Sequence, residues 1–237
     1  MTKSATVIIP TTGAASLADA IGSVLLQLHS SVECWVVIDG AAFAKSAFEI
    51  TNRYPSVKTM VLPDNTGANG FYGHRIYAAT SFLVNTDYVL FLDQDNWMRP
   101  NHISSQINNC ENNGLDWSYS LRSIYDKDGN YLLDDNCESL GKWPLFLSDQ
   151  HHLVDTSCYC IKRDTIVRVG GAWYGGWGWD RQFYATISHH FPNFNTTGVH
   201  SLCYRLDGNP NSVNKDFFIQ GNAVMQQKYG AMLPWTK

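Results

Sequence analysis

Short apolar runs and amphipathic stretches alternate along the first hundred residues. Apolar, β-branched runs predict strands at residues 6–9, 32–38, 57–62 and 88–92. Between them, apolar residues recur with the spacing of one helix face and predict helices at residues 17–28, 43–54 and 75–84. Because strands that alternate with helices join a parallel sheet through right-handed crossovers, this half predicts a Rossmann-like sheet flanked by helices.

The regular alternation of predicted strands and helices ends after Asp93. The later strands are predicted at residues 117–124, 131–133, 155–161 and 197–205. The later helices are predicted at residues 101–113, 163–169, 180–189 and 213–229. No linker, charge block or repeat interrupts the chain. We therefore predict one α/β domain over residues 1–237, with a mainly parallel half at about 1–100 and a smaller, more mixed half at about 101–237.

Composition and charge narrow the class of protein. Of the 237 residues, 44% are hydrophobic, which is enough for a sizeable core, and the net charge of −4 disfavours a nucleic-acid partner. No apolar run approaches the roughly 20 residues that span a bilayer, and the run before Pro10 is too short for a signal core. The six cysteines are scattered without zinc spacing. These features predict a cytoplasmic protein with reduced thiols and no membrane-spanning segment.

Polar residues follow the predicted strands at the edge where open α/β sheets bind ligands. They occupy residues 10–13, 39–40 and 93–96. Asp93 and Asp95 are one residue apart, so their side chains leave the strand on the same side. Two such carboxylates repel each other unless one stays protonated or a cation joins them, and their oxygens suit Mn²⁺ or Mg²⁺. The alternative is a pair of helix caps or solvated loop acids.

Together these segments resemble the family 2 glycosyltransferases, which have the GT-A fold. The resemblance covers about residues 5–185 and rests on several short segments rather than one motif. They are VIIPT at 7–11, AIGSVLLQ at 20–27, VVIDG at 36–40, NTG at 65–67, FLDQD at 91–95, VGG at 169–171 and GWGWD at 176–180. The resemblance implies that the first half binds a nucleotide and the second half an acceptor.

It also implies roles for single residues. The nucleotide would be held by six residues: Pro10, Thr11, Asp39, Asn65, Arg75 and Asp93. The metal would be held by Asp93, Asp95 and His200, and Asp180 would be the catalytic base. For Asp39 the alternative is a turn former before Gly40, and for His200 a satisfied core histidine.

The chain departs from the family pattern at three positions. Ile38 replaces an acidic neighbour of Asp39, and Ile76 stands where asparagine is common. Trp179 replaces the glutamate of a Glu-Asp pair that usually helps to hold the acceptor. We therefore expect the acceptor to stack on Trp177 or Trp179.

The resemblance implies a metal-dependent transfer of a sugar from a UDP-sugar donor to a hydroxyl of a carbohydrate or glycoconjugate acceptor, with inversion. One alternative is a sugar-1-phosphate nucleotidyltransferase, but residues 10–15 carry no lysine or arginine for a phosphate loop. The other is a non-catalytic carbohydrate-binding protein, which the 13% aromatic content suggests. Such a protein would need neither the acid pair nor Asp180.

Overall fold

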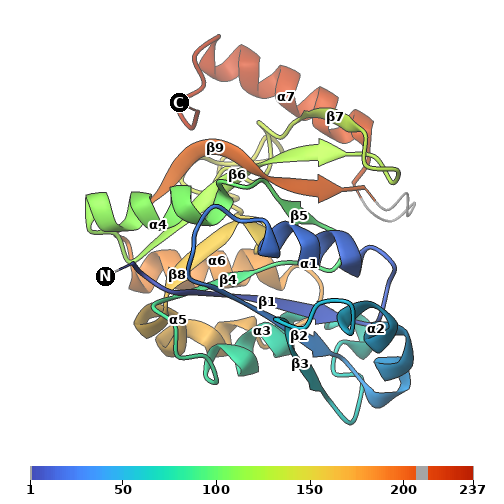
Figure 1. The fold of residues 1–237 in the computed structure, drawn as a ribbon. Helices are drawn as coiled ribbons and strands as arrows, with labels where there is room; N and C mark the ends of the chain where they lie inside the picture. The colour runs from blue at the N-terminus through green and yellow to red at the C-terminus, as the bar shows by residue number, and fades with distance from the viewer. Residues whose placement is uncertain (1, 207–212, 237) are drawn as a thin grey trace.

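The computed structural model describes residues 2–206 and 213–236. Figure 1 shows one continuous sheet with helices on both of its faces. The sheet has nine strands, eight of them in the order β3-β2-β1-β4-β8-β6-β9-β5, while β7 pairs with β6. The predicted α/β class and the GT-A architecture are confirmed.

The N-terminal half is the predicted parallel sheet. Its strands are β1 (Ala5–Thr11), β2 (Val32–Ile38), β3 (Lys58–Val61) and β4 (Tyr88–Phe91). The chain moves outward from β1 to β3 and then returns to β4 on the other side of β1. Right-handed crossovers therefore place α1 (Leu17–Leu25) and α2 (Ala44–Thr51) on one face and α3 (His74–Ser81) on the opposite one. The switch point between β1 and β4 opens a crevice at their carboxyl ends.

The distal half is mixed, as its irregular pattern predicted. Here β8 (Tyr159–Lys162) lies antiparallel between β4 and β6 (Trp117–Tyr125), and β9 (Phe194–Arg205) runs parallel to β6. Two short antiparallel strands, β5 (Trp97–Met98) and β7 (Tyr131–Asp134), complete the sheet. The helices of this half are α4 (His102–Asn113), α5 (Arg163–Val169), α6 (Trp179–His190) and α7 (Lys215–Tyr229).

Several element bounds differ by a few residues from the sequence-based predictions, and one short strand was not predicted. The helix predicted to reach residue 28 ends at Leu25. The strand predicted from residue 155 begins only at Tyr159, because the Asp155 carboxylate accepts the Ser157 amide and caps a 3₁₀ turn. The two-residue strand β5 was missed, since it is too short to show a period.

The core follows the same division. A large cluster joins both faces of the sheet, and a smaller one lies beneath α7, where Phe218 and Met225 pack on Leu121 and Ile124 of β6. All six cysteines are buried and unpaired, as predicted. Within the described residues, no helix has both the length and the apolar character needed to cross a bilayer.

Candidate active site

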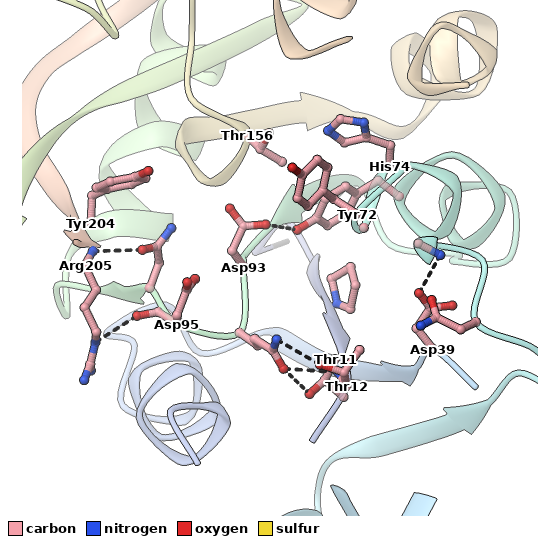
Figure 2. Close-up of a pocket in the computed structure, with 17 residues that line it drawn as sticks. Thr11, Thr12, Asp39, Tyr72, His74, Asp93, Asp95, Thr156, Tyr204 and Arg205 are labelled. Carbon is pink, nitrogen blue, oxygen red and sulfur yellow. Dashed lines mark hydrogen bonds between the residues drawn. The ribbon is translucent and has the colours of Figure 1, made fainter. Parts of the chain in front are cut away.

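A cavity of about 460 Å³ opens at the carboxyl ends of β1 and β4 (Figure 2). We call it the first cavity. Six of the eight residues predicted to bind nucleotide or metal line it: Pro10, Thr11, Asp39, Asn65, Asp93 and Asp95. The other two, Arg75 and His200, do not line it. The structure therefore brings most of the predicted nucleotide- and metal-binding residues together in one cavity.

Asp39 shapes the wall by holding the loop that carries Asn65. Its carboxylate accepts the Thr66 amide and hydroxyl at 2.7 and 2.8 Å, and the Gly67 amide at 2.8 Å. A Cβ on Gly67 would lie 2.7 Å from Asp39 Oδ2 and 2.3 Å from the Tyr72 carbonyl oxygen, so only glycine fits. Asp39 is thus both a loop-forming residue and part of the cavity lining.

Gln94 joins the ends of β1 and β4, a role that the sequence did not reveal. Its Oε1 accepts the Thr11 hydroxyl at 2.6 Å and the Thr12 amide at 3.1 Å. Both threonines line the cavity. This bridge keeps the two strand ends at a fixed separation across the crevice.

The acid pair lies at the base of the first cavity. Asp93 accepts the Tyr77 hydroxyl at 2.7 Å and the Ser157 hydroxyl at 3.2 Å. Burial, followed by the negative charges of Asp95 and Asp155, raises the pKa of Asp93 to about 7. A cation at this point would relieve both the desolvation and the repulsion, so the donor set fits a divalent metal.

A third protein ligand is not brought to this pair. Among the described residues, no group of three histidine, cysteine, aspartate or glutamate side chains is arranged to hold a metal ion. His200 faces Asp134 instead, with Nδ1 4.0 Å from Oδ2, and its Nε2 is buried without a hydrogen-bond partner in the described part of the chain. The role of His200 as a third metal ligand therefore stays a prediction.

Strand geometry explains why His200 misses the acid pair. On β9, His200 pairs with Leu121, whereas Tyr204 and Arg205 reach the first cavity. Four residues of extended strand separate His200 from Tyr204 by about 13 Å. Arg205 donates from Nε to the Asp95 carbonyl oxygen at 3.1 Å and from Nη2 to Asp19 Oδ2 at 2.6 Å. The guanidinium of Arg205, which the sequence analysis did not single out, thus lies next to Asp95.

Arg75 lies behind the first cavity rather than in it. Its guanidinium packs over the Phe71 ring, 3.5 Å from the centroid, and Nη1 donates to the Thr66 carbonyl oxygen at 3.4 Å. Its contacts therefore support the loop at residues 65–72.

A second cavity of about 620 Å³ adjoins the first, and it contains Asp180. Tyr72, His74, Thr156 and Tyr204 line both cavities. Asp180 lies in the first turn of α6, where its Oδ1 accepts the Arg181 amide at 2.8 Å. The structure therefore brings the predicted base into a cavity next to the acid pair.

Only one of the two predicted acceptor-binding tryptophans lines the second cavity. Trp177 lines the second cavity and is 78% exposed. Trp179 does not line it, because its ring packs on Gly175, where a Cβ would lie 1.9 Å from the ring. Trp179 instead lines a neighbouring groove, which Trp177 also borders.

The model of glycosyl transferase family 2 matches residues 6–162, about two thirds of the chain. The chain belongs to glycosyl transferase family 2. The resemblance is thus confirmed for residues 6–162, which supply most of the lining of the first cavity. Trp177, Asp180 and His200 follow the matched region.

Solved structures of another protein share the fold of this family 2 protein. Staphylococcus aureus TarS residues 1–349 in complex with UDP-GlcNAc superposes with a TM-score of 0.66 at 13% identity, over 98% of this chain and 68% of that one. The complex of the same fragment with UDP gives a TM-score of 0.65. The chain covers 60% of another TarS 1–349 structure and 41% of the longer TarS structure. No curated protein matches the sequence.

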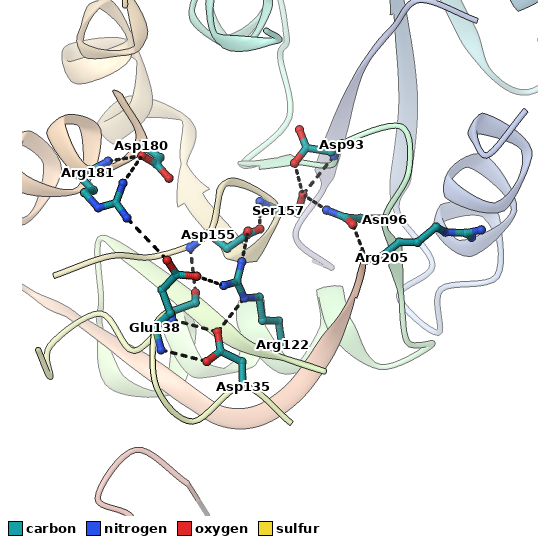
Figure 3. A network of polar contacts seen from close by, with 11 residues as sticks. Asp93, Asn96, Arg122, Asp135, Glu138, Asp155, Ser157, Asp180, Arg181 and Arg205 are labelled. Atoms are coloured by element: carbon teal, nitrogen blue, oxygen red, sulfur yellow. Dashed lines mark hydrogen bonds and ion pairs between the residues drawn. The ribbon is translucent and has the colours of Figure 1, made fainter. Parts of the chain in front are cut away.

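A buried charge network connects the two cavities of this family 2 protein (Figure 3). Arg122 donates from Nε to Asp135 Oδ2 at 2.8 Å, from Nη2 to Glu138 Oε2 at 2.5 Å and from Nη1 to Asp155 Oδ2 at 2.6 Å. Asp155 in turn accepts the amide of Ser157, whose hydroxyl reaches Asp93. In the sequence, the sign of this network is the stretch at 134–138, which contains three acidic residues.

Proposed function

We propose that this protein transfers a sugar from a UDP-sugar to an acceptor hydroxyl with inversion, in a metal-dependent reaction. One observation carries the proposal: the cavity with the acid pair adjoins a second cavity whose wall carries Asp180. The two cavities share four lining residues, so a donor in the first and an acceptor in the second would meet. The TarS structures with UDP-GlcNAc and UDP support this class of donor.

In this proposal the first cavity holds the donor. Thr11, Asp39 and Asn65 line this cavity and would take the uridine. The diphosphate would lie near Asp93, Asp95 and Arg205. Mn²⁺ or Mg²⁺, held by the two aspartates, would supply positive charge for the departing diphosphate.

Asp180 acts from the second cavity. Its carboxylate takes the proton of the acceptor hydroxyl as the hydroxyl oxygen forms a bond to the anomeric carbon. The bond from that carbon to the diphosphate oxygen breaks on the opposite face, and UDP leaves with the electron pair. The anomeric configuration is therefore inverted.

Two measurements on the whole chain test the proposal. Calorimetric titration with UDP should show binding that Mn²⁺ strengthens, and a panel of UDP-sugars should contain one from which the protein releases UDP. Absence of UDP binding with and without Mn²⁺ would overturn the proposal. Sugar binding without nucleotide binding would indicate a carbohydrate-binding protein instead.

A further inference from the structure

The carboxylates around Arg122 differ in one respect. Asp135 and Asp155 each use both oxygens, because Arg122 takes one and backbone amides take the other. Glu138 gives Oε2 to Arg122, but Oε1 accepts no hydrogen bond from any residue that the structure describes. Five of the six oxygens therefore accept hydrogen bonds within the described residues, and the sixth, Glu138 Oε1, has only an ion pair with Arg181.

The remaining oxygen belongs to the second cavity. Glu138 lines this cavity together with Asp180 and Arg181. Its Oε1 lies 3.6 Å from Arg181 Nη2, beyond hydrogen-bond length, and Arg181 Nη1 lies 4.0 Å from Asp180 Oδ1. Figure 3 shows this oxygen directed toward Arg181, next to Asp180. Glu138 Oε1 thus has an ion pair with Arg181 but no hydrogen bond from a described residue, so it can accept one from a ligand in this cavity.

We propose that Glu138 is an acceptor-binding residue, whose Oε1 accepts a hydrogen bond from a second hydroxyl of the acceptor sugar while Asp180 takes the proton of the attacking hydroxyl. This inference rests on the proposed function and deepens it. A sugar carries neighbouring hydroxyls, so one of them could donate to Glu138 while another is deprotonated by Asp180 in the same cavity.

Arg122 makes Glu138 suitable for this task. The short contact to Oε2 fixes the carboxylate before any ligand arrives, so little side-chain freedom is lost on binding. Glu138, Asp155 and Asp180 also outnumber Arg122 and Arg181 among the charged lining residues. A neutral hydroxyl-bearing sugar suits this wall, whereas a phosphate at this point would meet like charges.

The test uses Glu138→Gln in the whole chain. Arg122 donates, so it retains the amide oxygen of the glutamine and leaves the NH₂ group where Oε1 had been. The variant therefore places a donor where the proposal needs an acceptor, at almost unchanged volume. Glu111→Gln is the matched control, because Glu111 accepts the Tyr88 hydroxyl at 2.5 Å and lines neither cavity.

The donor is the UDP-sugar from which the wild type releases UDP most rapidly, and the acceptors are methyl glycosides of glucose, galactose, mannose and N-acetylglucosamine. Each reaction is measured as the ratio of new glycoside to hydrolysed sugar, which does not depend on the folded fraction. We expect Glu138→Gln to lower this ratio about 10- to 100-fold through a higher acceptor KM, as for a lost hydrogen bond to a charge. Donor hydrolysis and the Glu111→Gln ratio should stay unchanged.

Three outcomes overturn the assignment of Glu138. They are an unchanged ratio in Glu138→Gln, an equal loss of hydrolysis and transfer, and donor hydrolysis without transfer to any of the methyl glycosides. A wild type that releases UDP from no UDP-sugar would instead overturn the proposed function.

Discussion

The first and second cavities adjoin, yet they are built in different ways. About half of the residues that line the first lie at the ends of β1, β2 and β4 or directly after them, so the order of the parallel strands brings this part of the wall together. The wall of the second comes from β6, the segment 138–156, the start of α6 and the end of β9. These segments are distant in the chain, and Arg122 pairs with Glu138 and Asp155 of this wall and with Asp135 behind it. Backbone topology defines one cavity, and buried charge defines the other.

This difference separates the effects of substitution. In the first cavity, single side chains can be removed while the strand ends remain in place. Behind the second, the Arg122 side chain is 3% exposed and forms ion pairs with three carboxylates. Its loss would therefore leave negative charges buried without a partner. We therefore expect substitutions in the first cavity to weaken ligand binding, and substitutions in the network behind the second cavity to lower the free energy of unfolding.

The largest effect is expected for Asp180→Asn. Asparagine retains the hydrogen bond to the Arg181 amide but cannot accept a proton, and general base catalysis contributes roughly 10²–10⁴-fold. Turnover should fall by at least about 100-fold, while UDP-sugar affinity and the melting temperature stay near those of the wild type. Steady-state UDP release, calorimetry and a melting curve measure the three quantities.

Asp164→Asn serves as the control for Asp180→Asn. Asp164 also lies in the first turn of a helix, α5, but its side chain is 87% exposed and far from both cavities. This control should be fully active. An Asp180→Asn variant within a few-fold of wild-type turnover would show that another group takes the proton.

The sequence predicted the first cavity much better than the charge network behind the second. Pro10, Thr11, Asp39 and Asp93 follow apolar runs of clear period, so a local pattern located the first cavity. Arg122 and Glu138 meet through a register of β6 and a loop that no local pattern encodes. His200 does not line the first cavity for a related reason, since the position of a strand residue along the sheet depends on how the strands pair.

The next largest effect concerns Arg122→Met. It removes the charge that compensates Asp135, Glu138 and Asp155, and breaking a buried ion pair costs about 3–5 kcal/mol. Urea unfolding should show a loss of this size in the free energy of unfolding. Arg99→Met should cost less than about 1 kcal/mol, because Arg99 donates to the neutral hydroxyls of Ser123 and Tyr125, at 3.3 and 3.2 Å, rather than compensating three buried carboxylates. Equal effects of the two variants would contradict the role of the network.

Asp95→Ala tests the first cavity with a binding measurement. If Asp95 holds the metal, Mn²⁺-dependent UDP affinity should fall about 100-fold, since even outer-shell partners of a metal contribute about 10–100-fold. The melting temperature without metal should change little. The control is Asp19→Ala, which removes an acid that contacts Arg205 outside the cavity. Wild-type Mn²⁺ dependence in Asp95→Ala would exclude this residue as a ligand.

The smallest effect, and the sharpest test of the boundary between the cavities, is expected for His200→Leu. Leucine keeps most of the side-chain volume and removes the buried Nε2, which has no hydrogen-bond partner among the described residues. Because an unsatisfied buried polar group costs about 1–3 kcal/mol, the variant should be at least as stable as the wild type. Its Mn²⁺ requirement should be unchanged, since His200 lines neither cavity. A markedly higher Mn²⁺ requirement at equal stability would return His200 to the metal site and contradict the geometry of β9.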